Sequence, residues 1–257
     1  MTLLRANSEL RKDRVSNWTL PAWVVQVSDG SFVNVCPSAG ACVKLCYARN
    51  GTYQFKNVKQ AHVRNLELVL NDLPEFIRLM DEELSGKKFR PNGVPRLTNL
   101  RDQLIRDEWV LSWLDSGGSA VRIHDSGDFF NDAYTLAWLT IAEKFPDVLF
   151  YAYTKEVSRF RRIVEGKAPA NFRWIYSLGG KEDYLLSKDT DRHADVFPNL
   201  EAIENSGYVD QEENDLLCVL LDSTRIGVPA NNIKHYQKRQ GSETFGSLQE
   251  SRKKKTT

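Results

Sequence analysis

The feature that most constrains the fold of this chain is an alternation of strand-like and helix-like segments. Runs rich in β-branched and aromatic residues occur at 120–124, 148–153 and 172–178. Between them, at 131–145 and 157–164, apolar residues recur at helical spacing. Strands that alternate with helices are typical of a parallel sheet. The sequence therefore predicts an α/β fold, either a partial or complete TIM-like α/β barrel or an open doubly wound sheet.

The segments on either side of this region extend the same pattern. A β-rich run at 22–27 ends at a Ser-Asp-Gly turn and is interpreted as the first strand. Apolar residues at helical spacing predict helices at 57–70, 73–84 and 100–114. A further strand is expected at the apolar run 216–221.

The composition indicates a globular protein without a strong overall charge. The chain is 41% hydrophobic and 27% charged with a net charge of +1, which favours neither nucleic acid nor a membrane as a partner. It has no signal-peptide pattern and no apolar run near the roughly 20 residues that span a bilayer, so we expect a cytoplasmic location. Residues 1–20 are expected to be poorly ordered, 21–240 to form a single domain, and 241–257 to be a flexible basic tail, either solvated or touching a polyanion such as nucleic acid.

Polar residues follow each of the first four predicted strands. A cysteine loop comes after the first strand, and the segments 125–128, 154–156 and 179–181 come after the next three. In barrels and in doubly wound sheets, functional groups gather at the carboxyl ends of the strands. We therefore expect these four segments to meet at one edge of the sheet. The acidic run at 210–215 is expected to be a solvated loop.

The cysteine loop is the strongest chemical signal in the sequence. Cys36, Cys42 and Cys46 have the spacing C-x₅-C-x₃-C, and thiolates are soft ligands for iron–sulfur clusters or zinc. A structural zinc site needs four ligands, so zinc would need a histidine in addition. A third interpretation is three thiols packed as small hydrophobic groups. Cys218 lies in an apolar run and is expected to be a core thiol, with a fourth cluster ligand as the alternative. These residues make 21–240 a candidate iron–sulfur domain.

Two of the other strand ends carry candidate ligand-binding groups. Ser126, Gly127 and Asp128 follow the second strand, and Asp128 is interpreted either as a ligand-facing carboxylate or as a turn residue. Lys155 follows the third strand. It would pair with a carboxylate or phosphate of a substrate, or else be a solvated lysine at a helix start.

Three segments taken together resemble a known family. They are CPSAGACVKLCYARNGTY, RIHDSGDFFN and FYAYTKE. In combination they resemble the phage "gene product 88" family, which is itself similar to the radical S-adenosylmethionine superfamily. The resemblance implies a partial or complete α/β barrel with a four-iron cluster at its mouth, held by Cys36, Cys42 and Cys46. Both gaps between the cysteines are longer than the C-x₃-C-x₂-C that is usual in that superfamily.

The same resemblance implies that S-adenosylmethionine binds beside the cluster. Gly127 and Asp128 would contact its amino group, with Ser126 and His124 next to them. The implied activity is that of a radical enzyme of unassigned reaction, in the host cytoplasm. The alternative is a non-enzymatic phage accessory protein whose cluster is structural or redox-sensing and whose surface binds a host protein or nucleic acid. A zinc protein is the lesser alternative.

Overall fold

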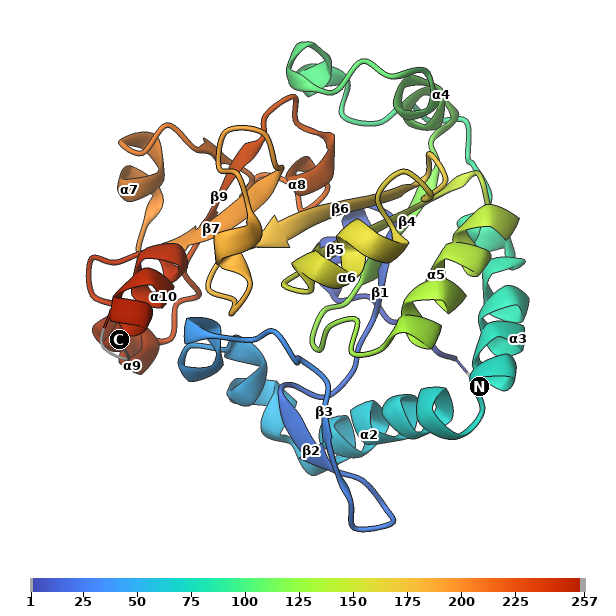
Figure 1. Cartoon of the computed structure of the whole chain (residues 1–257). Helices are drawn as coiled ribbons and strands as arrows, with labels where there is room; N and C mark the ends of the chain where they lie inside the picture. The colour runs from blue at the N-terminus through green and yellow to red at the C-terminus, as the bar shows by residue number, and fades with distance from the viewer. Residues whose placement is uncertain (1, 255–257) are drawn as a thin grey trace.

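The computed structural model describes residues 2–254 of the 257-residue chain. Its centre is a seven-stranded sheet with the order β1-β4-β5-β6-β7-β9-β8 (Figure 1). Every paired strand in this sheet is parallel to its neighbour, which confirms the predicted α/β class. β1 and β8 are its two edges, so strand pairing does not close a barrel within residues 2–254. The strands are β1 (Val15–Trp18), β4 (Ser119–Ile123), β5 (Val148–Thr154), β6 (Phe172–Ser177), β7 (His193–Phe197), β8 (Val209–Asp210) and β9 (Arg225–Pro229).

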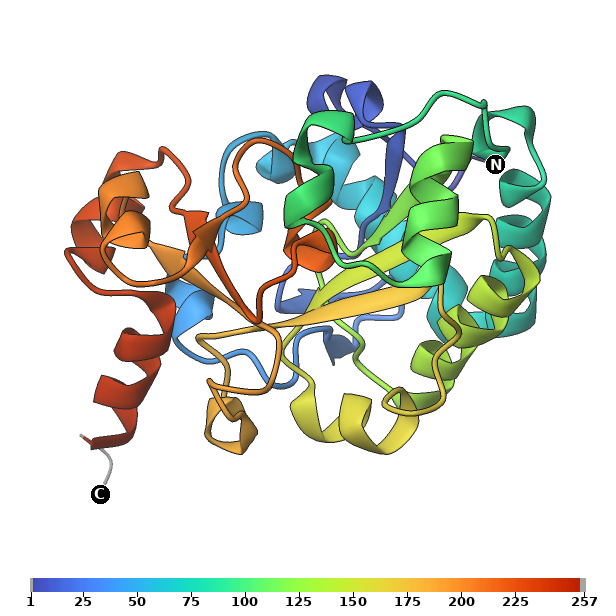
Figure 2. The ribbon, with the colours of Figure 1, turned by 90° about the horizontal axis from the view of Figure 1, so that it is seen from above.

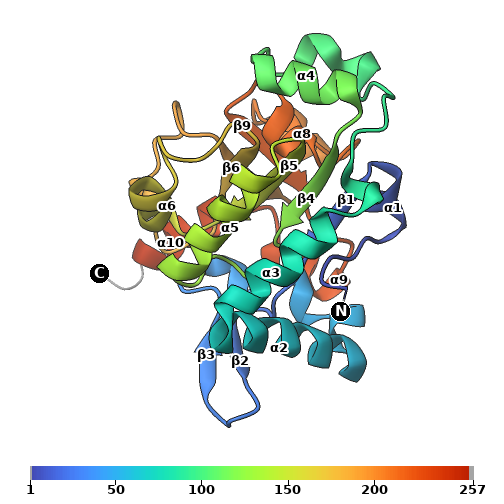
Figure 3. The same ribbon diagram turned by 90° about the vertical axis from the view of Figure 1, so that its right-hand side faces the viewer.

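A separate antiparallel hairpin precedes the cysteine loop. It consists of β2 (Val24–Gln26) and β3 (Phe32–Asn34), and it projects from the body of the protein (Figure 3). The predicted first strand is therefore real but lies outside the main sheet. The cysteine loop consequently follows a hairpin, and it reaches the sheet through tertiary contacts.

One face of the sheet is covered by four helices, and the core beneath them combines aliphatic and aromatic residues. These are α2 (Lys56–Asn71), α3 (Leu73–Leu84), α5 (Asp132–Lys144) and α6 (Val157–Ile163). Side-chain caps fix two of the starts, because Asp72 accepts a hydrogen bond from the backbone N–H of Glu75 and Asn131 accepts one from that of Tyr134. The helices between β4 and β6 thus lie on the same side of the sheet (Figure 1).

The opposite face and the β7–β9 end carry the remaining helices. Figures 1 and 2 show α9 and α10 gathered beside β7. No helix within residues 2–254 is both long and apolar enough to cross a bilayer. The helices are α1 (Ser8–Lys12), α4 (Glu108–Ser116), α7 (Leu200–Glu204), α8 (Leu217–Leu220), α9 (Lys234–Gln240) and α10 (Phe245–Lys254), with 3₁₀ turns η1 (Ala41–Lys44), η2 (Tyr47–Arg49), η3 (Gly51–Gln54), η4 (Lys87–Phe89), η5 (Thr98–Gln103) and η6 (Asp183–Leu185).

The N-terminal segment differs from its predicted lack of order. It supplies α1 and the edge strand β1, whose register pairs Val15 with Ala120 of β4. Trp18 at the end of β1 has no exposed surface. The local sequence is polar, and the strand that pairs with β1 lies about a hundred residues further along the chain. The local pattern therefore could not predict that this segment is ordered.

The C-terminal segment also differs from the predicted flexible tail. Residues 245–254 form α10, and residues 255–257 of the predicted tail lie outside the described part of the chain. Gln249 of α10 is buried, and its Oε1 accepts a 2.7 Å hydrogen bond from the backbone N–H of Ala41. The backbone N–H of Gly246 donates to Asp195 at 2.9 Å. These contacts make α10 part of the domain.

Two apolar segments adopt structures other than those expected. The run 216–221 contains the helix α8 where a strand was predicted, because a short apolar run does not distinguish a buried helix from a buried strand. Cys218 within it is fully buried, as expected of a core thiol. The predicted helix 100–114 is divided into η5 and α4, and Asp107 caps the start of α4.

Candidate functional site

A cavity of about 560 Å³ opens where the carboxyl ends of β4, β5, β6, β7 and β9 meet the cysteine loop. This volume falls in the range of small-molecule sites, and the place is where parallel sheets carry such sites. The cavity is lined by each of the predicted site residues: Cys36, Cys42, Cys46, Ser126, Gly127, Asp128 and Lys155. The strand-end segments that the sequence predicted to meet therefore do meet, and we call this space the cysteine cavity.

The cysteine loop is fixed by hydrogen bonds to the turn after β6. The backbone N–H groups of Gly40 and Cys42 donate to the carbonyl oxygen of Gly179, at 3.1 and 3.3 Å. A side chain at Gly40 has no room, because its Cβ would lie 2.7 Å from that carbonyl and 2.3 Å from Oε1 of Gln249. The loop is thus held between the sheet and α10, and its thiols face a cavity with a defined wall.

The three thiols are free and half-buried. Burial raises the pKa of Cys36 well above its ordinary value, and the negative charge of Asp128 raises it further. Burial also raises the pKa of Cys46, against the lowering effect of Lys155. The cavity therefore favours the neutral thiol at Cys36 and at Cys46. Within the described residues, no set of three or more His, Cys, Asp or Glu side chains is grouped around a position for a metal ion.

Asp128 braces the ends of two strands. Its Oδ1 accepts hydrogen bonds from the hydroxyl of Thr154 at 2.7 Å and from the N–H of Phe129 at 2.8 Å. Its Oδ2 accepts from the N–H of Lys155 at 2.9 Å. The side chain is 5% exposed, and burial raises its pKa. The carboxylate therefore joins the segment after β4 to the segment after β5.

The residues beside Asp128 are held in place in different ways. Gly127 has a φ of +90°, and a Cβ there would lie 2.6 Å from that of Leu20, so only glycine fits. Lys155 donates from Nζ to the hydroxyl of Ser177 at 2.6 Å, which keeps its ammonium group on the cavity wall.

Several residues that line the cavity have a buried polar atom without a hydrogen-bond partner among the described residues. These atoms are Arg122 Nε, His124 Nδ1, Ser126 Oγ and Gln211 Oε1. The imidazole of His124 stays neutral, because burial lowers its pKa to about 3. Buried polar atoms in proteins are nearly always hydrogen-bonded, to protein, water or ligand. Their concentration in one cavity supports the binding of a polar ligand.

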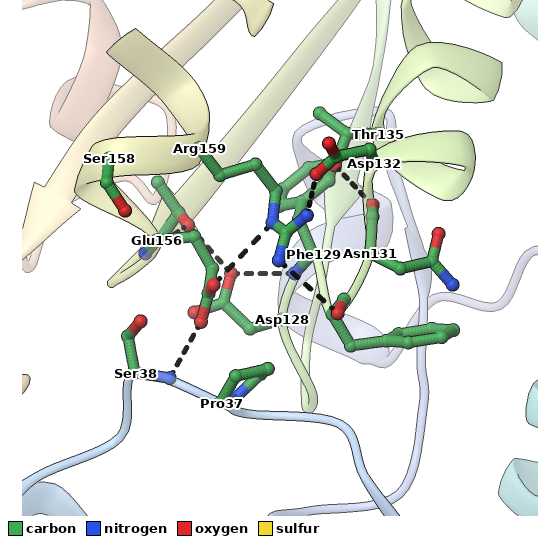
Figure 4. Close-up of polar contacts among 12 residues, drawn as sticks. Pro37, Ser38, Asp128, Phe129, Asn131, Asp132, Thr135, Glu156, Ser158 and Arg159 are labelled. Atoms are coloured by element: carbon green, nitrogen blue, oxygen red, sulfur yellow. Dashed lines mark hydrogen bonds and ion pairs between the residues drawn. The ribbon is translucent and has the colours of Figure 1, made fainter. Parts of the chain in front are cut away.

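Glu156 holds the cysteine loop through a hydrogen bond to Ser38 and was not predicted as a site residue. Figure 4 shows its carboxylate between Ser38 and Arg159. Oε1 accepts a 2.8 Å hydrogen bond from the N–H of Ser38, and Oε2 lies 3.6 Å from Nε of Arg159. Arg159 in turn pairs with Asp132 at the start of α5. The only sequence signal was the position of Glu156 directly after the predicted strand end.

Glu156 gives the fold a pH dependence. Burial and then the charge of Asp128 raise its pKa from 4.5 to about 7. A proton is then held more tightly in the folded state, so this group's stabilisation is complete below about pH 4.5 and lost as the pH rises through about 7. We expect the wild type to lose about 2–3 kcal/mol more stability than Glu156→Gln between about pH 5 and pH 8. Urea unfolding of both proteins at the two pH values measures this; parallel losses would contradict it.

The far wall of the cavity contains an ion pair that the sequence did not reveal. Arg122 of β4 lies 3.1 Å from Asp215, and the hydroxyl of Tyr151 donates to the same carboxylate. Gln211 is 9% exposed. The prediction of a solvated acidic loop is therefore wrong for Asp215 and Gln211. The acidic composition of this segment does not indicate that Arg122, which lies on a strand distant in the sequence, pairs with Asp215.

These features define an α/β protein with a thiol-lined cavity at the carboxyl edge of a parallel sheet. A family model described as "Gene product 88" matches residues 1–256, and the chain belongs to this family. The "Gene 88 protein" of Mycobacterium phage D29 and that of Mycobacterium phage L5 are each 31% identical to it over 124 residues. Each alignment covers 47% of this chain and 42% of the relative. The chain thus matches less than half the length of these relatives, and no solved structure matches it. The family part of the predicted resemblance is confirmed.

Proposed function

We propose that this protein binds an iron–sulfur cluster, most simply a four-iron cluster, through Cys36, Cys42 and Cys46. The observation that carries the proposal is that these three free thiols line one cavity together with the strand-end residues. Thiolates are the kind of ligand that such clusters require. Among the described residues the three thiols line the cavity without being grouped around one metal position, so binding would draw them together. Because Gly40 has no side chain, the loop backbone can lie close to the turn that follows β6.

The chain's own residues have separate tasks in this proposal. The cysteines lose their protons on ligation, and the positive charge of the bound metal offsets the burial that raises the pKa of Cys36 and Cys46. Glu156 holds the loop through the N–H of Ser38. A bound cluster would supply electrons at the cavity wall.

We further propose that the protein is a radical S-adenosylmethionine-like enzyme with a partial TIM-like barrel. It would act in the host cytoplasm on an unassigned substrate. The ammonium group of Lys155 suits the cofactor's carboxylate, and the hydroxyl of Ser126 is a buried group in need of a partner. The consecutive parallel strands β4, β5 and β6, with the crossover helices α5 and α6 on the same face, support a partial barrel.

A second candidate is a non-enzymatic accessory protein with a structural or redox-sensing cluster that binds a host protein or nucleic acid. The hydrogen bonds of Asp128 favour this candidate, because its carboxylate already accepts three of them from the protein itself. Gly127 likewise serves a tight turn against Leu20. Both residues thus have structural tasks that need no cofactor.

Anaerobic purification followed by iron, sulfide and zinc analysis tests the proposal. We expect about four irons and four sulfides per chain in the wild type. Cys42→Ser is expected to lose most of the iron, whereas Cys218→Ser, which changes the core thiol outside the cavity, should keep it. Zinc without sulfide would point to the lesser alternative, a zinc protein, and would overturn the iron–sulfur proposal.

Electron paramagnetic resonance separates the two candidates. A spectrum of the reduced cluster that changes when S-adenosylmethionine is added supports the enzyme. A spectrum that ignores the cofactor supports the accessory protein. Lys155→Ala should weaken the cofactor's effect on the spectrum without loss of iron if the enzyme proposal is correct.

A further inference from the structure

A second cavity, of about 850 Å³, lies beside the cysteine cavity and plays no part in the proposed function. It is lined by residues of the N-terminal segment, β1, η3 and α2. Tyr53 and Asp125 line both cavities, and the hydroxyl of Tyr53 donates to Oδ2 of Asp125. This hydrogen-bonded pair therefore belongs to the walls of both spaces.

Two arginines give the second cavity its charge. Arg5 and Arg64 both line it, and the side chain of neither has an ion-pair or hydrogen-bond partner among the described residues. Asp125 is the acidic residue of the lining, and its carboxylate is engaged by Tyr53. His62 contributes no charge near neutral pH, because burial lowers its pKa. The lining therefore carries two cationic groups against one anionic group.

The guanidinium of Arg5 extends from a fixed backbone. The N–H of Arg5 donates to the carbonyl of Asn17 at 3.0 Å, and the N–H of Asn17 donates back to Arg5 at 2.6 Å. This pairing ties the segment to the edge strand β1. Arg64 extends from the second half of the 16-residue helix α2. Both arginines are thus presented by ordered elements, which lowers the entropy cost of holding an anion between them.

Neutral hydrogen-bonding groups complete the lining. Asn17 is 7% exposed, and its Nδ2 donates to Thr19 at 2.9 Å, so its orientation is set. Thr52 and Asn57 line the cavity beside the ring of Tyr53. Such a mixture of oriented amides, a hydroxyl and an aromatic edge is typical of sites that hold a small polar molecule.

We propose that the second cavity binds a small molecule through a phosphate group held by Arg5 and Arg64. The planar guanidinium fork matches the oxygens of phosphate and of carboxylate, and two forks around one group favour the more highly charged phosphate. A space of about 850 Å³ is of the size that holds a small molecule, whereas a nucleic-acid strand requires an extended basic groove. The inference does not depend on a metal in the neighbouring cavity.

Isothermal titration of the full-length protein with inorganic phosphate, in a phosphate-free buffer of low salt, tests the proposal. We expect saturable binding to the wild type, and about tenfold weaker binding to Arg5→Gln and to Arg64→Gln, because each loses a charge-assisted pair. Both residues are exposed, so these variants should unfold at the wild-type urea concentration. The matched control is Arg106→Gln, whose side chain is 70% exposed and pairs with Asp102 outside the cavity.

Equal weakening by Arg106→Gln, or no saturable binding, would overturn the proposal. Citrate as a second probe separates the two sources of oxyanion, and tighter binding of citrate than of phosphate would reject phosphate as the recognised group. A single-stranded oligonucleotide that binds more tightly than phosphate, and depends on both arginines, would instead indicate a nucleic-acid surface. Retention of phosphate binding in Cys42→Ser would show that this site stands apart from the cysteine cavity.

Discussion

Asp128→Ala is expected to lower the free energy of unfolding by about 3 kcal/mol or more. The substitution leaves the hydroxyl of Thr154 and the N–H groups of Phe129 and Lys155 without their acceptor in a buried place. Each unpaired buried donor costs about 1–3 kcal/mol. The removal of a buried carboxylate with a raised pKa offsets part of this loss. Urea unfolding at constant pH measures the difference.

The matched control for this experiment is Asp102→Ala, because the side chain of Asp102 is fully exposed and, among residues 2–254, pairs with Arg106 alone. A change within about 0.5 kcal/mol is expected there. Asp128→Asn keeps one carboxyl-type oxygen and should lose less stability than Asp128→Ala. If Asp128→Ala were as stable as the wild type, Asp128 would not be the brace between β4 and β5, and a ligand-facing role would gain support.

Trp18→Ala is expected to cost about 3–5 kcal/mol, the range for large aromatic residues removed from a core. The indole of Trp18 is fully buried and lies 5.1 Å from the ring of Phe76 and 6.4 Å from that of Trp138. Its Nε1 also donates to the hydroxyl of Tyr134 at 2.8 Å, so the substitution removes a buried hydrogen bond as well. The measurement is again urea unfolding.

This prediction tests whether the first twenty residues belong to the domain. Trp23→Ala serves as the control, because Trp23 is the same residue type a few positions away but is 39% exposed. A loss of about 1 kcal/mol or less is expected for it. Similar small losses for both tryptophans would mean that β1 contributes little to the stability of the sheet.

The sequence predicted best where local signals agree with the tertiary structure. Helix α3 coincides with its predicted range 73–84, because Asp72 caps it and Pro74 stands in its first turn. β5 was found because its residues are apolar on both faces, as those of buried parallel strands are, and β6 because it is rich in aromatic residues. The sequence also predicted that the cysteine loop meets residues 126–128 and 155, because functional groups in parallel sheets gather at the carboxyl ends of the strands.

Elements stabilised by distant partners were missed. β7 contains His193 and Asp195, which interrupt its apolar pattern. The ring of His193 is satisfied by the carbonyl of Asp191 at 2.8 Å and the hydroxyl of Tyr208 at 2.7 Å. Asp195 likewise receives the N–H of Gly246 from α10. A polar residue that finds its partner through tertiary contacts looks, in the sequence alone, like a residue of a loop.

The same long-range contacts set an order of events during synthesis of the chain. Cys36, Cys42 and Cys46 leave the ribosome long before α10 does. The backbone N–H of Ala41, in the same loop, can form its hydrogen bond only after Gln249, 208 positions further along, has been synthesised. Domains begin to fold as their N-terminal parts emerge, but a contact cannot form before both partners exist. The thiol loop therefore stays incompletely tethered for most of translation and takes its final shape only when α10 is released. A nascent chain arrested before α10 should carry cysteines that thiol reagents reach more readily than those of the finished protein.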